Sequence, residues 1–338
     1  MRKNLNYLLT GLLFVLAVTM SFAFGMSSEG VSIATVAVVN SQLKNTLAEK
    51  EMIKQLRHEH TWVGEIRPRQ NWVNQDTIKV PKRGAAPKVL IDNTNYPILK
   101  NRREDSHVVI SLHKFDTENT IVTEDELYAL PYEKVSDVQV QHRETLEDET
   151  QEYGLWGLAP QEKSEANNLF VLTTTGENDG TGRKKLTTKD LRTLQEKMNT
   201  KGISKKGRIL ILCDEHVSDL LEEDRKFYTQ YHNHKEGAIA NRYYGFTVYE
   251  DSTTPEYTFN SADSKWEKIP YGSTTSGNKS SVVFHKGSTA KAIGTVKRFM
   301  RAASEDPENR ENTIGFRLYH IIVAYGIEGS AAIVSANA

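Results

Sequence analysis

The sequence predicts an α+β fold, in which a mixed sheet packs with a small number of helices. Three observations predict it. The run Ile209–Cys213 is entirely apolar, which is typical of a strand buried on both faces. Residues 315–326 alternate in character, as closing strands of a sheet do. Between the strand-rich ends of the chain, residues 123–153 have the periodicity of a long helix.

The first 26 residues are apolar and have a basic start. Arg2 and Lys3 precede an uncharged stretch that runs to Gly25. This outline is that of a secretory signal peptide. The stretch also has about the 20 residues that a membrane span needs. A third interpretation is that translation begins at Met20 or Met26, and the sequence leaves all three open.

Residues 27–60 contain few large apolar side chains. Leu43, Leu47, Ile53 and Leu56 lie at rough helical spacing in an otherwise polar run. Such a segment buries too little apolar surface to offset the entropy of ordering it alone. We therefore predict an N-terminal arm that makes its contacts on something else.

Residues 61–115 read as short strand-like pieces separated by Pro, Gly and Asn turn signals. The pieces are residues 62–66, 77–80, 88–91 and 108–112. Residues 81–87 read as an exposed hairpin tip with charged side chains. Because an isolated two-stranded ribbon is marginally stable, we predict that this hairpin lies on a neighbouring molecule.

The predicted long helix begins with a capping box formed by Thr123 and Glu126. A narrow apolar stripe follows, and charged residues occupy the remaining faces. The stripe consists of Val135, Val138, His142 and Leu146. The pattern indicates a helix that packs along one side only.

The second half of the chain alternates between strands and helices. A loop at 176–185 leads to a helix from Thr188 that carries Leu191, Leu194 and Met198. After the buried strand, Asp214 is a good N-cap for a short helix. The remaining predicted parts are a strand at 245–250, a polar surface excursion at 251–280, and closing strands at 315–326 and 331–334.

Composition limits the classes of function. The chain has 338 residues, enough for two or three domains. With 43 basic and 44 acidic residues the net charge is −1, so no overall positive field attracts nucleic acid. This argues against a dedicated DNA-binding protein. It is compatible with a container, which gains nothing from gripping DNA that it merely encloses.

No catalytic, cofactor-binding or metal site is predicted. The single cysteine, Cys213, permits no intrachain disulfide and reads as a small apolar side chain in a core strand. Gly176–Lys185 has glycine and lysine in the wrong order for a phosphate-binding loop. The Gly-x-Ser-x-Gly motif of serine hydrolases is missing from the sequence.

Two pairs of histidines have the spacing i and i+2, namely His58 with His60 and His232 with His234. On a helix such neighbours point apart, and neither pair has a cysteine or carboxylate partner at a zinc-site spacing. We interpret all four as surface histidines.

The order of the predicted parts is more informative than any single motif. It resembles the major capsid protein of tailed phages, the Hong Kong 97 type of fold that encapsulins also have. The resemblance covers about residues 27–338. Three segments carry it: residues 117–134, residues 208–221, and residues 284–293 with the charged loop 304–313 and the strands that follow. None is a strict signature, so the order and the total length carry the specificity.

The resemblance implies a division of the chain. The parts are a hydrophobic leader (1–26), an N-terminal arm (27–60), an extended hairpin loop (61–115), a peripheral domain with a spine helix (116–186), an axial domain (187–300), and a return to the peripheral domain (301–338).

The resemblance also implies a function without catalysis. The expected role is self-assembly, through hexamers and pentamers, into an icosahedral shell that encloses phage double-stranded DNA without sequence-specific contact. Expected partners are copies of the chain, scaffold, portal and decoration proteins, with assembly in the host cytoplasm and a final location in the virion. The alternatives are an encapsulin-like compartment and an exported surface or periplasmic binding protein, in which the leader would contact the membrane.

Some relatives crosslink a lysine to an asparagine of another subunit, and the hairpin lysines here are Lys79, Lys82 and Lys100. We interpret these three as ordinary surface lysines. Residues that qualify as DNA contacts by charge alone are Arg67, Arg69, Lys82, Arg83, Lys184 and Lys185.

Overall fold

The computed structural model describes residues 61–74, 77–82, 88–94, 96–98, 100, 102–123, 134–161, 170–234, 237–262, 265–306, 308–325 and 329–338. The predicted leader and arm, and residues 83–87 of the predicted hairpin tip, lie outside these ranges. The chain divides into one unit of residues 57–295 and 299–338, described below, and another of residues 1–56 and 296–298. Among the helices of the described residues, none is both long and apolar enough to cross a membrane.

The hairpin predicted in residues 61–115 is present as a three-stranded antiparallel sheet. Its strands, in spatial order, are β1 (Val73–Asn74), β2 (Thr77–Lys82) and β3 (Ser106–Ser111). The strand predictions at 77–80 and 108–112 are confirmed, but those at 62–66 and 88–91 are wrong. Residues Trp62–Glu65 form the 3-10 helix η1, a second 3-10 helix, η2, spans Gln70–Trp72, and residues 88–91 form an unpaired loop.

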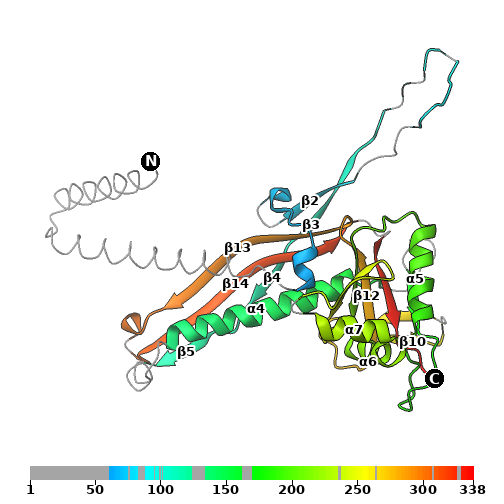
Figure 1. Cartoon of the computed structure of the whole chain (residues 1–338). Coiled ribbons are helices and arrows are strands. Elements are labelled where there is room, and N and C mark those ends of the chain that lie inside the picture. Colours follow the sequence, from blue (N-terminus) through cyan, green and yellow to red (C-terminus); the bar gives the residue numbers. More distant parts are fainter. Residues whose placement is uncertain are drawn as a thin grey trace. The chain divides into compact units, whose positions relative to one another are not determined.

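A second sheet lies beside the long helix (Figure 1). Its strands are β4 (His113–Asp116), β5 (Thr120–Thr123), β13 (Thr289–Arg301) and β14 (Glu311–Ala324). They take the order β13-β14-β4, and β5 also pairs with β14. A 3-10 helix, η3 (Ala303–Glu305), separates β13 from β14. The helix α4 (Lys134–Leu158) packs along β14.

The helix differs from its predicted bounds. Thr123 ends strand β5 instead of capping a helix, and Glu126 lies outside the described residues. The predicted stripe is confirmed for Val138, His142 and Leu146, which are buried, while Val135 is half-buried. The helix continues past residue 153 to Leu158, and Gly154 lets it approach β14 closely. A Cβ at this position would lie only 2.5 Å from Cδ1 of Ile322.

The third sheet has eight strands and is mixed, as predicted, because β7–β9 and β6–β15 pair in parallel and the other pairs are antiparallel. The strands are β6 (Phe170–Thr173), β7 (Arg208–Leu212), β8 (Ala240–Tyr243), β9 (Phe246–Glu250), β10 (Glu256–Asn260), β11 (Lys265–Lys268), β12 (Asn278–His285) and β15 (Ala331–Val334). The helices that follow or precede them are α5 (Thr188–Thr200), α6 (Asp214–Glu223) and α7 (Arg225–Asn233).

Strand β7 is buried on both faces, as its apolar run predicts. Leu210 and Leu212 belong to the core that helices α5, α6 and α7 cover. Ile209 and Ile211 face the opposite core, which the last turn of α4 and residues 62–66 complete. Alternation along one strand therefore fills two cores at once.

Two details of this region correct predictions made from the sequence, and a third is a helix that was not predicted. The helix is α7, which follows Asp224 and whose Phe227 is buried. The predicted surface excursion at 251–280 contains β10, β11 and the start of β12, and its Tyr257 is fully buried. Helix α6 takes Cys213 as its N-cap, and Asp214 is the first helical residue.

Replacing His142 with leucine is expected to raise the free energy of unfolding by about 1 kcal/mol. The ring is buried beside Phe316, with 5.7 Å between ring centroids, and its Nε2 has no hydrogen-bond partner among the described residues. Burial lowers the pKa of His142, so the ring is neutral at pH 7 and leucine removes only an unsatisfied polar atom. Chemical denaturation measures the change. The neighbouring exposed substitution Gln141→Leu is the control, and a loss of stability in His142→Leu would contradict the expectation.

Candidate self-assembly surface

The distal loop of the hairpin, defined here as residues 88–105, exposes a concentration of apolar side chains. Twelve large apolar side chains are exposed in the described part of the chain, and five of them lie within residues 89–98. They are Val89 (87% exposed), Leu90 (56%), Ile91 (84%), Tyr96 (76%) and Ile98 (52%). Single exposed apolar residues are normal, but a contiguous group marks an interaction site.

The base of the hairpin is well fixed. Strands β2 and β3 form six residue pairs, from Thr77 opposite Ser111 to Lys82 opposite Ser106. Ile78 and Val80 are buried in a core with Leu112 and Ile321. The distal loop therefore projects from the far end of the β2–β3 ladder, away from the buried residues at its base (Figure 1).

Residues 61–66 anchor the chain just before the hairpin. The indole Nε1 of Trp62 donates a 2.8 Å hydrogen bond to Asp251, and its ring packs edge-on against Phe284 at 5.9 Å. The Glu65 carboxylate accepts from the Lys286 ammonium at 2.6 Å and from the Tyr249 hydroxyl at 3.2 Å. These contacts join η1 to β9, to the loop after it and to the end of β12.

Five aromatic rings gather beside the last turns of α4. This group, called the Tyr153 cluster, consists of His113, Phe115, Tyr153, Trp156 and Tyr271. Tyr153 lies at its centre, with ring centroids 4.7 Å from His113 and 5.0 Å from Tyr271. Its members come from β4, α4 and the loop after β11. His113 is exposed and the other four rings are half-buried, so the cluster is open to solvent.

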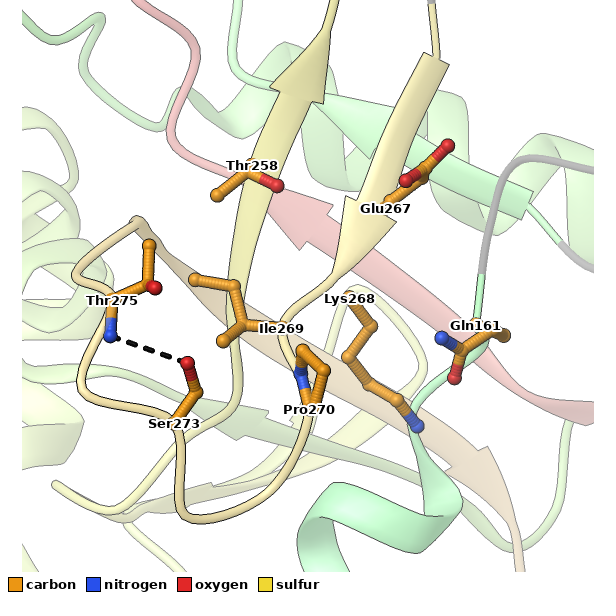
Figure 2. A pocket seen from close by; sticks show the side chains of 8 residues that line it. All are labelled: Gln161, Thr258, Glu267, Lys268, Ile269, Pro270, Ser273 and Thr275. Carbon is orange, nitrogen blue, oxygen red and sulfur yellow. Dashed lines mark hydrogen bonds between the residues drawn. The ribbon is translucent and has the colours of Figure 1, made fainter.

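Lys268 ties β11 to the end of α4. Its side chain runs from the strand toward the helix (Figure 2). The ammonium donates to the carbonyl of Trp156 at 2.7 Å and of Ala159 at 2.9 Å, and lies 4.0 Å from the Trp156 ring centroid. Burial lowers the pKa of Lys268 to about 8. The contacts satisfy carbonyls that a helix C-terminus leaves without partners.

A cavity of about 410 Å³ lies next to this lysine. Figure 2 shows its lining from β10, β11 and the loop that follows. The lining residues are Gln161, Thr258, Glu267, Lys268, Ile269, Pro270, Ser273 and Thr275. The Lys268 ammonium in this lining is already bound to two carbonyls, and the Glu267 carboxylate accepts a 3.0 Å hydrogen bond from the Asn260 side-chain amide.

The residues singled out as possible crosslinking or DNA contacts lie on different elements. Lys79 is exposed on β2, and Lys100 is exposed in the distal loop. Lys82 ends β2, and Arg83 lies outside the described residues.

The other basic candidates do not share a single element either. Arg67 is exposed, and the guanidinium of Arg69 lies 4.7 Å from the centroid of the Trp72 ring. Lys184 and Lys185 belong to the loop before α5, where Lys185 pairs with Glu222 at 2.6 Å. The DNA and crosslinking assignments stay predictions.

The structure describes two of the four histidines interpreted as surface residues, and it describes the single cysteine. His232 packs edge-on against Tyr228 with 4.2 Å between ring centroids, and His234 is exposed. His58 and His60 lie outside the described ranges. Cys213 is buried, and burial raises the pKa of its thiol to about 11. Within the described ranges, three or more His, Cys, Asp or Glu side chains nowhere converge as metal ligands would.

The chain is similar to known proteins in its structure but not in its sequence. Neither a protein-family model nor a curated protein sequence matches the chain. A chain of the capsid of Ralstonia phage GP4 is similar with a TM-score of 0.59 at 6% identity, over 81% of this chain and 87% of that one. A chain of the capsid of the cyanophage P-SCSP1u is similar with a TM-score of 0.53 at 12% identity, over 81% and 86%.

A further similarity is to a virus-like particle from Pyrococcus furiosus, with a TM-score of 0.50 at 8% identity, over 86% of this chain and 99% of that one. The structural similarity shows a shared fold, and sequence identities this low limit the conclusion to the fold. The chain therefore has the fold of these capsid and particle subunits, and the predicted Hong Kong 97-type α+β fold is confirmed.

Proposed function

We propose that the chain is a structural subunit that assembles with copies of itself into an icosahedral shell enclosing phage double-stranded DNA. The observation that carries the proposal is the exposed apolar distal loop, held out by a hairpin on a capsid fold. Burying one such side chain contributes about 1.5–3 kcal/mol, so five of them supply a strong drive for association. Contacts repeated between identical copies close into a symmetric assembly.

The proposal includes how the shell is built. The subunits form hexamers and pentamers, and the chain divides into the domains that the sequence indicates. Scaffold, portal and decoration proteins take part in assembly, which occurs in the host cytoplasm. The fold supports a structural role without catalysis. A net charge of −1 suits a wall that encloses DNA without gripping it.

An encapsulin-like compartment is the second candidate. The similarity to the Pyrococcus furiosus particle, which extends over 99% of that chain, favours it. The contents of particles purified from the native source separate the two functions, since the first predicts DNA inside and the second predicts protein cargo.

The test of assembly is electron microscopy with size-exclusion chromatography on the full-length chain and on a chain that starts at Met26. Uniform closed particles or ring-shaped capsomers from the shorter chain support the proposal. Clean monomers from both, with the leader removed on export, would overturn it in favour of an exported binding protein.

Replacing Val89, Ile91 and Tyr96 together by serine is expected to reduce the assembled fraction at least about tenfold. Because these side chains are exposed in the single chain, its free energy of unfolding should change by less than about 0.5 kcal/mol. Sedimentation measures assembly, and denaturation of the single chain measures stability. Val140→Ser, which removes an exposed apolar side chain from α4, is the matched control. Unchanged assembly of the triple variant would contradict the role of the distal loop.

A further inference from the structure

The small net charge of the chain conceals a strongly basic segment. Residues 197–213 carry five basic residues and no aspartate or glutamate. The five are Lys197, Lys201, Lys205, Lys206 and Arg208. The segment runs from the last turn of α5 through a loop into β7, and Lys205 and Lys206 are exposed in that loop. A local concentration of positive charge attracts anions, whatever the total charge of the chain.

Arg208, at the start of β7, is buried without a carboxylate beside it. Its side chain is 1% exposed. The guanidinium donates to the carbonyls of Ile203 at 2.6 Å and Ser204 at 3.0 Å, and to the amide oxygen of Asn199 at 2.9 Å. Its Nη1 has no partner among the described residues. Because amide oxygens carry only partial charges, the charge of Arg208 is not neutralised and favours a nearby anion.

His285 shows which other cations lie close to Arg208. The two residues are opposite each other in the pairing of β7 with β12. The His285 Nε2 donates to the carbonyl of Lys206 at 3.0 Å, and its Nδ1 accepts from the amide of Gly287 at 3.1 Å. Burial lowers the pKa of His285, and the charges of Arg208 and Arg67 lower it further. Arg67, Lys206 and Arg208 therefore lie around one side chain.

The exposed cations of this surface are not paired within the described part of the chain. Arg67, Lys205 and Lys206 are exposed, and none of them forms an ion pair with a described residue. Lys286 differs, because its ammonium pairs with Glu65 at 2.6 Å. Arg67, Lys205 and Lys206 are called the basic surface below.

The chemistry of the basic surface fits the backbone of a nucleic acid. Three separate cations suit a ligand that repeats its negative charge, and duplex DNA carries one phosphate charge per about 1.7 Å of helix axis. A lysine ammonium acts as a point charge and binds a phosphate without selecting a base. Contacts of this kind are independent of sequence.

We propose that the basic surface binds the phosphate groups of double-stranded DNA, with Arg208 as a positioning residue under the loop that carries Lys205 and Lys206. This inference rests on the proposed function and deepens it, because it names where the enclosed DNA touches the wall of the shell. Arg208 holds the loop through two backbone carbonyls and adds positive potential. The contact is weak, as three cations per subunit are few, and it is compatible with a net charge of −1.

Binding of a fluorescent DNA duplex to the full-length chain at several NaCl concentrations tests the proposal. Each neutralised phosphate contributes about −0.9 to the slope of log K against log salt, so three contacts give a slope of about −3. The triple variant Arg67→Gln, Lys205→Gln, Lys206→Gln is expected to lower the affinity at least about tenfold at low salt and to bring the slope close to zero.

The double variant Arg225→Gln, Lys226→Gln is the matched control, because it removes two adjacent exposed cations from α7. Its affinity for the duplex is expected to stay within about twofold of that of the unaltered chain. Circular dichroism verifies folding of every variant. An unchanged affinity in the folded triple variant, or an equal loss in the control, overturns the site.

The role of Arg208 has its own test. Arg208→Met removes the buried charge and is expected to lower the duplex affinity about threefold while the salt slope stays near −3, since the three exposed contacts remain. Arg208→Lys keeps a positive charge and is expected to recover most of the affinity. Unchanged affinity in the folded methionine variant, or no recovery in the lysine variant, overturns the positioning role.

Acetylation of lysines, read by mass spectrometry, locates the contact. The duplex is expected to slow acetylation of Lys205 and Lys206 at least about fivefold and to leave Lys226 unaffected. Inorganic phosphate, at the same concentration of phosphate groups, is expected to protect neither. Equal protection by inorganic phosphate would assign the surface to free phosphate and overturn the DNA assignment.

Failure of this inference and failure of the proposed function give different results. Shells that form from a chain without affinity for the duplex overturn the DNA site alone. Absence of shells overturns the proposed function, and the duplex affinity of the folded chain then decides separately whether the basic surface binds phosphate groups.

Discussion

Replacing Trp62 with alanine is expected to lower the free energy of unfolding by about 4 kcal/mol. The side chain is 1% exposed and shares a core with Leu155, Ile211 and Phe284. Removing a buried aromatic ring loses its transfer free energy and leaves a cavity, which together cost about 3–5 kcal/mol. The lost indole N–H also withdraws one partner from the buried Asp251.

Chemical denaturation of the single chain measures the effect, and two variants bracket it. Trp62→Phe keeps a ring against Phe284 but loses the hydrogen bond, so it should cost about 1–2 kcal/mol. Tyr96→Ala removes an exposed aromatic ring and should leave stability within about 0.5 kcal/mol. A cost below about 1 kcal/mol for Trp62→Ala would show that η1 does not anchor the chain as the structure indicates.

The second large effect concerns pH. His216 is fully buried, its Nδ1 lies 2.6 Å from the Ser281 hydroxyl and its Nε2 lies 3.0 Å from the Ser335 hydroxyl. Burial lowers its pKa to about 4, against about 6.5 in an unfolded chain. Between these values the unfolded state binds the proton and the folded state does not. Stability is therefore lost as pH falls from 6.5 to 4, by about 3 kcal/mol.

Because carboxylates titrate in the same range, the test compares variants. His216→Gln keeps a group that can hydrogen-bond to the two hydroxyls but does not titrate. Between pH 7 and pH 4 it should lose about 3 kcal/mol less stability than the unaltered chain, measured by urea denaturation at each pH. His107→Gln, at an exposed position on β3, should follow the unaltered chain. Parallel curves for His216→Gln and the unaltered chain would refute the assignment.

The sequence pattern was sufficient to predict a strand or helix where the spacing of apolar residues matched the side that the structure buries. The run Ile209–Cys213 is typical of a strand with both faces covered, and β7 is one. Leu191, Leu194 and Met198 share one face of a helix at their spacing, and α5 buries all three. The fold itself came from the order of such parts, because no single segment carries a strict signature.

Other features depended on contacts between residues far apart in the sequence. Residues 62–66 look like a strand, yet they form a 3-10 helix because Trp62, Val63 and Ile66 fill a core under β7 and β12. The region 251–280 is polar in composition, but Tyr257 is buried against β15 and its hydroxyl donates to the carbonyl of Pro160. Such a partner cannot be inferred from nearby residues.

The same distinction applies to the candidate surface. The sequence by itself determined that the chain has a hairpin, a long and highly charged helix and a mixed sheet, because periodicity and apolar runs are local properties. Only the tertiary structure decided that β4, α4 and the loop after β11 bring five aromatic rings together beside Glu149 and Glu152. It also decided that the distal loop stands apart from them. Residues separated by more than a hundred positions meet through packing, and packing leaves no periodic trace in the sequence.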